Sequence, residues 1–354
     1  MKLLAAISHH GLGHLAQAGP VLAQLHALSP DLDLTVWSAL GTEALQSRLP
    51  FSFCHRREAA DVGLPMVDAV TVDKQVSLSV YLDFHDQWDR RVAGEADWLR
   101  EQGFQAVFSD VAYLPLAAAS QAAIPAVALC SLNWRDIASA YLGDESAMAS
   151  VLTQMETAYL AATDFLRPAP SMPMEWLPQR RAISPIAARG TNRRAELAGM
   201  PGVHARDKWV LVGFGGIGYV RSLPRLPGIT WLAPDGWAND RADVIPLRCI
   251  GLPFIDLVAS CDALLTKVGY GSFVEAVAHG VPVLYIDRPD WPETPFLARW
   301  LDEHGNGLPV VEAEAFSPRA GEYLERLWKK PPKPVPQTNG ATEAALFLRR
   351  LMTG

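Results

Sequence analysis

Short apolar runs alternate with longer segments of helical periodicity from the first residue of the chain. Residues 2–8, 32–39 and 104–110 are apolar runs of strand length, and the segments that follow them repeat apolar positions every three or four residues. Runs that are apolar almost throughout are typical of parallel strands covered on both faces. The alternation therefore predicts βαβ units, with a parallel sheet between two layers of helices.

The same order of elements begins again near residue 208. A strand-like run over 208–213 ends in the loop Gly-Phe-Gly-Gly, and three more runs of this kind follow, at 229–234, 262–268 and 281–287. Two such series in 354 residues indicate two domains of ordinary size. We expect them to cover residues 1–185 and 186–335. A last helix, within 338–353, is expected to pack back on the first domain.

Charge and composition exclude several classes of protein. The net charge is −7, and the arginine pairs are scattered, so the basic surface typical of nucleic-acid binding is not expected. The four cysteines show no C-x-x-C spacing, which favours free thiols in the cytoplasm. No apolar run approaches the roughly 20 residues of a membrane span, so no transmembrane segment is expected.

A histidine and glycine loop follows the first predicted strand. Gly11 and Gly13 allow a sharp turn and a close approach of backbone to a ligand on the acceptor side. His14 falls in the first turn of the next helix, where the positive end of the helix dipole favours neutral imidazole, the form of a general base. The alternative is a histidine that only hydrogen-bonds within the loop. The loop lacks the G-x-G-x-x-G pattern, so a nicotinamide cofactor is not expected.

Polar residues also follow two further strands of the first half. Asp110 ends the strand over 104–110, where it would orient His14 or, alternatively, cap the next helix. Asn133 and Trp134 follow the strand after that and fall on the same edge of the sheet. Trp134 would stack on a sugar or belong to the core.

The second half carries a more specific pattern. A strand runs into Lys267, which is followed by Gly269, Gly271 and Ser272 at the expected start of a helix. Exposed N–H groups at a helix start, next to an ammonium group, suit a diphosphate. Glu275 lies one turn further and would reach ribose hydroxyls.

The stretch 250–307 resembles the donor-binding half of GT-B glycosyltransferases, the enzymes that use nucleotide-sugars. The strings KVGYGSFVEA (267–276) and ETPFLARWL (293–301), with SDV (109–111) and NWRD (133–136), are similar to glycosyltransferase family 1 and to the peptidoglycan N-acetylglucosaminyltransferase. They are still more similar to the glycosyltransferase-like domain of plant arabinokinases. The resemblance implies a GT-B fold, in which two doubly wound Rossmann-like domains face a central cleft.

The resemblance also implies a role for each donor-side residue. Lys267 stands where many family members have a histidine that touches the diphosphate. Three pairs of residues complete the donor side, with roles toward the phosphates, the base and the donor sugar respectively: Gly215 and Gly216, Phe254 and Ile255, and Glu293 and Thr294.

Together these patterns predict a glycosyltransferase that moves a sugar from a UDP- or dTDP-type donor to an acceptor hydroxyl. His14, supported by Asp110, would be the base, and neither a metal nor a cofactor would be needed. Two alternatives stay open, namely a nucleotide-sugar 2-epimerase on the same fold and a nucleotide-sugar-binding protein without catalysis. No motif names the acceptor or an oligomeric state.

Overall fold

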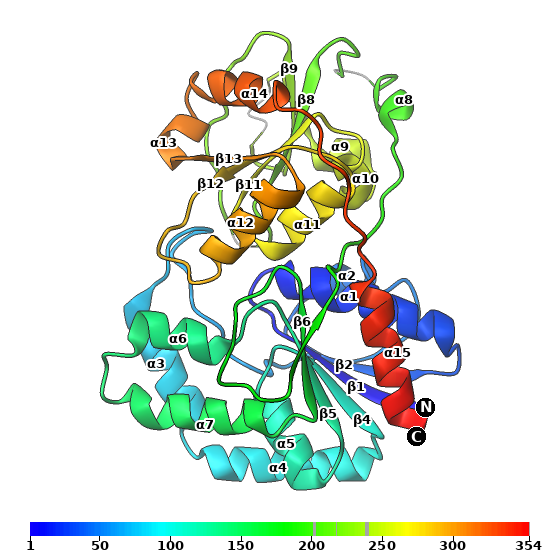
Figure 1. Cartoon of the computed structure of the whole chain (residues 1–354), viewed down its shortest axis with the longest axis vertical. Coiled ribbons are helices and arrows are strands. Elements are labelled where there is room, and N and C mark those ends of the chain that lie inside the picture. The colour runs from blue at the N-terminus through cyan, green and yellow to red at the C-terminus, as the bar shows by residue number, and fades with distance from the viewer. Residues whose placement is uncertain (201–202, 217, 238–240, 354) are drawn as a thin grey trace. The chain divides into compact units, whose positions relative to one another are not determined.

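The chain forms two compact units in a computed structural model that describes residues 1–200, 203–216, 218–237 and 241–353. Unit 1 consists of Met1–Val67, Thr71–Ile186 and Thr338–Gly354. Unit 2 consists of Asp68–Val70 and Ala187–Gln337. Both units are α/β, and each is built on a wholly parallel sheet (Figure 1).

The sheet of unit 1 has seven strands in the order β3-β2-β1-β4-β5-β6-β7. Its central strands are buried over almost their whole length, because they consist mainly of apolar residues that helices cover on both faces. In the register, Ala5 of β1 lies opposite Val36 on one side and Phe108 on the other. The strands are β1 (Lys2–Ile7), β2 (Asp33–Trp37), β3 (Cys54–Arg56), β4 (Ala106–Asp110), β5 (Ala126–Leu129), β6 (Asp164–Pro168) and β7 (Arg180–Ile183).

The longer helices of unit 1, all except α2, fall into two packed groups. The C-terminal helix lies along α1, so the end of the chain packs against its beginning (Figure 1). The other group is formed by α4, α5 and α7 together with α3 and α6. The helices are α1 (Gly13–Leu28), α2 (Thr42–Gln46), α3 (Lys74–His85), α4 (Trp88–Gln102), α5 (Leu114–Ala122), α6 (Trp134–Leu142), α7 (Met148–Leu160) and α15 (Gly340–Thr353).

Unit 2 repeats this architecture with a six-stranded sheet in the order β10-β9-β8-β11-β12-β13. Trp209 and Trp231 are fully buried on its strands and fill much of the core. The strands are β8 (Lys208–Gly213), β9 (Ile229–Ala233), β10 (Val244–Pro246), β11 (Ala263–Lys267), β12 (Val283–Ile286) and β13 (Gly307–Val310). The helices are α8 (Arg194–Leu197), α9 (Leu247–Ile250), α10 (Phe254–Val258), α11 (Tyr270–Ala278), α12 (Thr294–His304), α13 (Glu312–Ala315) and α14 (Ala320–Trp328).

Three residues of unit 2 come from the loop between β3 and α3. Ala69 is fully buried in the hydrophobic core of unit 2, and Val70 packs against that core. The Asp68 carboxylate lies 3.3 Å from the guanidinium of Arg221. Ala69 and Val70 therefore belong to the core of unit 2, and Asp68 adds an ion pair to this unit.

The predicted α/β architecture, with doubly wound parallel sheets, is confirmed. In both sheets the strand order runs outward in two directions from the first strand, β1 or β8, which is the doubly wound pattern. Five short strands are absent from the prediction because they span only three to five residues and mostly lie at the sheet margins, namely β3, β6, β7, β10 and β13.

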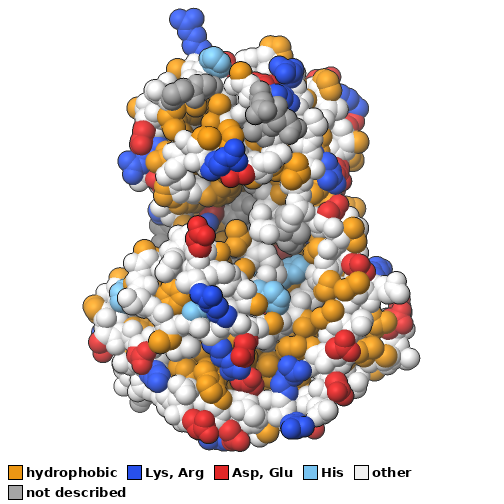
Figure 2. Space-filling model, turned by 180° about the vertical axis from the view of Figure 1, so that it is seen from behind, with side chains coloured by type: hydrophobic (Ala, Val, Ile, Leu, Met, Phe, Trp, Pro, Cys, Tyr) orange, Lys and Arg blue, Asp and Glu red, His pale blue; other side chains and the backbone are white. Residues whose placement is uncertain are grey.

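The surface agrees with the charge pattern of the sequence. On the face shown in Figure 2, acidic and basic side chains are interspersed, and no broad basic area is visible. Among the described residues, no helix has both the length and the apolar composition required to span a bilayer.

The start of α15 offers a test of how the C-terminal helix is held in unit 1. A Cβ atom on Gly340 would lie 2.0 Å from the carbonyl oxygen of Ser184 and 2.9 Å from Cγ1 of Ile186. We predict that Gly340→Ala destabilises the protein by about 1–3 kcal/mol, because the obstacle is backbone. Urea unfolding measures this difference.

Gly94→Ala is the matched control. Gly94 is an exposed residue of α4, and a Cβ there would meet nothing within 4 Å. Alanine in this helix should stabilise by up to about 1 kcal/mol. Equal unfolding midpoints for Gly340→Ala and the wild type would contradict the predicted packing.

Candidate functional site

The polar residues of unit 1 gather where three neighbouring strands end. The loop after β1 holds His9 to Leu12, β4 ends at Asp110, and β5 is followed by Cys130. Because β1, β4 and β5 are adjacent and parallel, their carboxyl ends meet at one edge of the sheet. The backbone N–H of Ser8 donates to the carbonyl oxygen of Asp110 over 2.7 Å, which fixes the two strand ends together.

His14 and Asp110 form a buried pair at this edge. Nδ1 of His14 lies 3.0 Å from Oδ1 of Asp110. The Asp110 side chain is fully buried, and that of His14 is 6% exposed. Burial raises the pKa of Asp110 to about 6, against the opposing effect of its hydrogen bond with His14. The helix-cap alternative for Asp110 is wrong, because the N-cap residue of α5 is Tyr113.

The backbone conformation before His14 accounts for the glycine at position 11. Gly11 has φ +74°, a left-handed conformation that favours glycine, and its N–H donates to the carbonyl oxygen of His9. A Cβ on Gly13 would meet nothing within 4 Å, so this glycine leaves open space beside the start of α1. His14 is the second residue of α1, whose N-cap position Leu12 makes no side-chain cap.

Asn133 and Trp134 are both fully buried. Asn133 caps α6, since its Oδ1 accepts from the N–H of Asp136 over 2.8 Å. The indole N–H of Trp134 donates to the Asp61 carboxylate over 2.8 Å, and its ring centroid lies 5.4 Å from that of His14. In this structure Trp134 therefore belongs to the packing behind His14, the second of the two roles open to it from the sequence.

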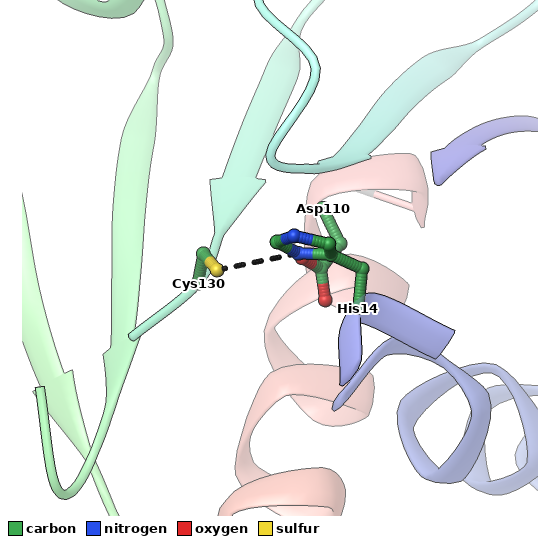
Figure 3. A group of neighbouring side chains, drawn as sticks. All are labelled: His14, Asp110 and Cys130. Atoms are coloured by element: carbon green, nitrogen blue, oxygen red, sulfur yellow. Dashed lines mark hydrogen bonds and ion pairs between the residues drawn. The ribbon is translucent and has the colours of Figure 1, made fainter. Parts of the chain in front are cut away.

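Two buried residues of this edge are absent from the sequence prediction. The Asp61 carboxylate accepts a hydrogen bond from the indole N–H of Trp134 and lies 3.6 Å from Nδ1 of His9. Cys130 places its sulfur 3.7 Å from Nδ1 of His14 (Figure 3). Asp61 lies in an irregular loop, and Cys130 looks like one more apolar residue at the end of a strand. Neither shows a sequence signal of its own.

The carboxyl edge of the sheet in unit 2 holds most of the predicted donor residues. Gly213 ends β8, and a Cβ there would lie 2.7 Å from Cζ of Phe254, so the ring of Phe254 packs directly on this backbone. Gly215 has φ +77° and forms a turn with Gly216. Ile255 follows Phe254 in α10 and is partly buried.

Lys267 ends β11, the strand next to β8. Its ammonium group donates to the carbonyl oxygen of Ala69 over 2.8 Å. Burial, together with the positive charge of Arg288, lowers the pKa of Lys267 to about 8, against the opposing effect of Asp68. In this structure the predicted phosphate-binding group is therefore in contact with the segment Asp68–Val70.

The predicted helix after Lys267 begins two residues before Ser272. Gly269 is the N-cap residue of α11, so Gly271 and Ser272 lie in its first turn. The hydroxyl of Thr266 donates to the carbonyl oxygen of Gly213 and lies 3.3 Å from the hydroxyl of Ser272, which joins β8, β11 and α11 at the sheet edge. Glu275 is buried on α11.

The loop after β12 brings a further cation to this edge. Arg288 is buried, and its guanidinium carbon lies 4.6 Å from the centre of the Trp291 ring. The indole N–H of Trp291 donates to Glu293, and the hydroxyl of Thr294 donates to the carbonyl oxygen of Arg288. Arg288 is absent from the sequence prediction, although the structure places its charge close enough to Lys267 to lower the pKa of that amine.

Comparison with known proteins gives one curated relative over nearly the whole chain. The chain is 25% identical to the L-arabinokinase of Arabidopsis thaliana over an alignment of 358 positions, which covers 98% of this chain and 34% of that protein. The chain therefore spans about a third of the length of this relative. No protein-family model matches the chain.

Solved structures show the fold. The glycosyltransferase VinC, in complex with dTDP, aligns with a TM-score of 0.59 at 16% identity and covers 99% of this chain and 95% of its own. UGT2 of Phytolacca americana, complexed with UDP-2-fluoro-glucose and pterostilbene, aligns with a TM-score of 0.56 at 14% identity over 99% and 92% of the two chains. The GT-B fold predicted from the sequence is confirmed.

The low pKa of Lys267 predicts how stability depends on pH. In the unfolded chain this amine has its ordinary pKa near 10.5, so between about pH 8 and 10.5 the unfolded chain binds more protons than the folded one. Burial of the charge therefore costs stability below pH 8, and stability increases through this window. We predict that the free energy of unfolding of Lys267→Met, minus that of the wild type, falls by up to about 3 kcal/mol from pH 7.5 to 10.5.

Denaturant unfolding at a series of pH values measures this difference. Lys329→Met serves as the control, because the Lys329 side chain is 77% exposed and should give a nearly constant difference. A constant difference for Lys267→Met as well would show that its amine has an ordinary pKa.

Proposed function

We propose that the chain is a glycosyltransferase that moves a sugar from a UDP- or dTDP-type nucleotide-sugar to an acceptor hydroxyl. The observation that carries this proposal is the buried pair of His14 and Asp110, with Nδ1 and Oδ1 3.0 Å apart. Similarity to the L-arabinokinase and to solved glycosyltransferases supports it. Unit 1 supplies the base, and unit 2 supplies the contacts to the donor.

The pair supports a separate role for each nitrogen of the His14 ring. An ionised Asp110 accepts a hydrogen bond from Nδ1–H, which leaves Nε2 as the acceptor nitrogen of the neutral ring. Nε2 removes the proton of the acceptor hydroxyl while the oxygen bonds to the anomeric carbon. Asp110 then faces an imidazolium ring and stabilises its charge.

The leaving group departs with the electron pair of the bond between the anomeric carbon and the phosphate oxygen. Its negative charge is stabilised by Lys267, by Arg288 and by the N–H groups at the start of α11. Two cations and a helix N-terminus provide the compensating positive charge within the chain, so we propose that transfer needs no metal. Glu275 is the proposed contact to the ribose, while Glu293 and Thr294 are the proposed contacts to the donor sugar.

Donor binding is tested by thermal shift and calorimetry with UDP, dTDP, GDP and their common sugars. We predict that one nucleotide raises the unfolding midpoint in proportion to the logarithm of its concentration. Glu275→Gln should weaken its affinity about 10- to 100-fold, because a hydrogen bond to a charged group is lost. Glu303→Gln removes the same charge from an exposed position of α12 and should change nothing.

The outcomes separate the possible functions. Binding and turnover of the nucleotide-sugar with no acceptor present would favour a 2-epimerase. Binding with no turnover, whichever acceptor is offered, would favour a binding protein without catalysis. No stabilisation by any nucleotide would refute the donor site.

The base is tested by transfer kinetics of His14→Ala. We predict that kcat falls about 10²- to 10⁴-fold while donor affinity stays within about twofold, as expected for the loss of a general base. His26→Gln is the control on the same helix, because His26 stacks on Phe51 near the other end of α1. Comparable losses in both variants would mean that His14 acts only through the fold.

A further inference from the structure

We propose that Cys130 completes, with His14 and Asp110, a binding site for Zn²⁺ that switches off the base. Figure 3 shows the three side chains converging from α1, the end of β4 and the end of β5. Nδ1 of His14 lies 3.0 Å from Oδ1 of Asp110 and 3.7 Å from the sulfur of Cys130. One ligand atom from each residue lies within 4.8 Å of the other two.

The distances suit a tetrahedral ion. Zinc bonds of about 2.0–2.3 Å at tetrahedral angles separate ligand atoms by roughly 3.3–3.7 Å. The two measured distances of 3.0 Å and 3.7 Å lie within a few tenths of an ångström of this range. The third separation is at most 4.8 Å, so the site needs a contraction of up to roughly 1.1–1.5 Å there when the ion binds. A water molecule would take the fourth position.

Charge and ligand type favour zinc over the hard cations. A carboxylate and a thiolate carry two negative charges, so a bound Zn²⁺ leaves the buried cluster neutral overall. Zinc accepts nitrogen, sulfur and oxygen ligands, whereas Mg²⁺ and Ca²⁺ take six or more oxygens. Only Asp110 of the three residues offers an oxygen.

Gln17 orients the cysteine. It lies three residues after His14 on α1, and its Nε2 is 3.6 Å from the sulfur of Cys130 and 3.2 Å from the hydroxyl of Ser131. Its Oε1 accepts from the N–H of Ser131 over 3.1 Å. Such outer contacts hold the ligands of metal sites in place and are worth about 10- to 100-fold in affinity.

Zinc at Nδ1 changes the chemistry of His14. The ion takes the place of the Nδ1 proton, so the neutral ring must carry its proton on Nε2. The thiol of Cys130 releases one proton to solvent as it becomes the ligand. Nε2 then has no lone pair for an acceptor proton. This inhibitory consequence rests on the proposed function, whereas the binding of zinc does not.

The test uses the full-length chain with its two exposed thiols removed, as Cys54→Ser and Cys249→Ser. Cd²⁺ is the spectroscopic probe, since a cadmium–thiolate bond gives a near-ultraviolet charge-transfer band, and Zn²⁺ affinity is measured by calorimetry. We predict one equivalent of either ion. Adding Cys130→Ala should abolish the band and weaken Zn²⁺ binding at least about 100-fold.

Cys261→Ala is the matched control, because Cys261 is the other buried cysteine and belongs to unit 2. It should keep both the band and the affinity. Asp110→Asn, which keeps the shape of the side chain, should weaken the affinity and retain the band, and circular dichroism verifies that each variant is folded. No band in the parent, or an equal band after Cys130→Ala, would overturn the site.

Activity distinguishes this proposal from the proposed function. Tight Zn²⁺ binding by a chain that transfers no sugar would refute the transferase and leave the metal site standing. Transfer that continues at saturating Zn²⁺ would overturn the inhibition.

Discussion

The hydrogen bond between His14 and Asp110 constrains everything around it in unit 1. A carboxylate without any contact to water is costly unless a donor faces it, and His14 is the donor that the fold supplies. Its position requires α1 to begin a short loop after the end of β1, and it requires β4 to lie next to β1. The tight turn at Gly11 and the Ser8 hydrogen bond to Asp110 satisfy these two requirements.

A second buried carboxylate supports the same edge from behind. Asp61 accepts the indole N–H of Trp134, whose ring packs near both His10 and His14. The histidine loop therefore rests on a rigid aromatic surface that is fixed by a polar bond. Rigid support of this kind holds a catalytic side chain in one geometry, because neither the ring nor the loop can move alone.

The sequence predicts local features of this fold well and distant contacts poorly. The principal strands, α1, α11 and α15 follow from the spacing of apolar residues, and the glycines mark the turns correctly. Asp110 pairs with His14 across 96 positions, and the proximity of Cys130 to His14 spans 116. These contacts depend on the order of strands in the sheet, which periodicity does not encode. The bond from Lys267 to Ala69 spans 198 positions and joins β11 to the segment Asp68–Val70 of the same unit, which shows no sequence pattern.

The charged side chains at the two sheet edges are arranged differently. The edge of unit 1 pairs an acid with a base, so its charges compensate one another. The edge of unit 2 holds Lys267 and Arg288 close enough for the charge of Arg288 to lower the pKa of Lys267, an effect that the carboxylate of Asp68 opposes. Two neighbouring cations with restricted access to water favour an anion. A diphosphate carries negative charge, so this pair of cations is the reason that the proposed function assigns the donor to unit 2.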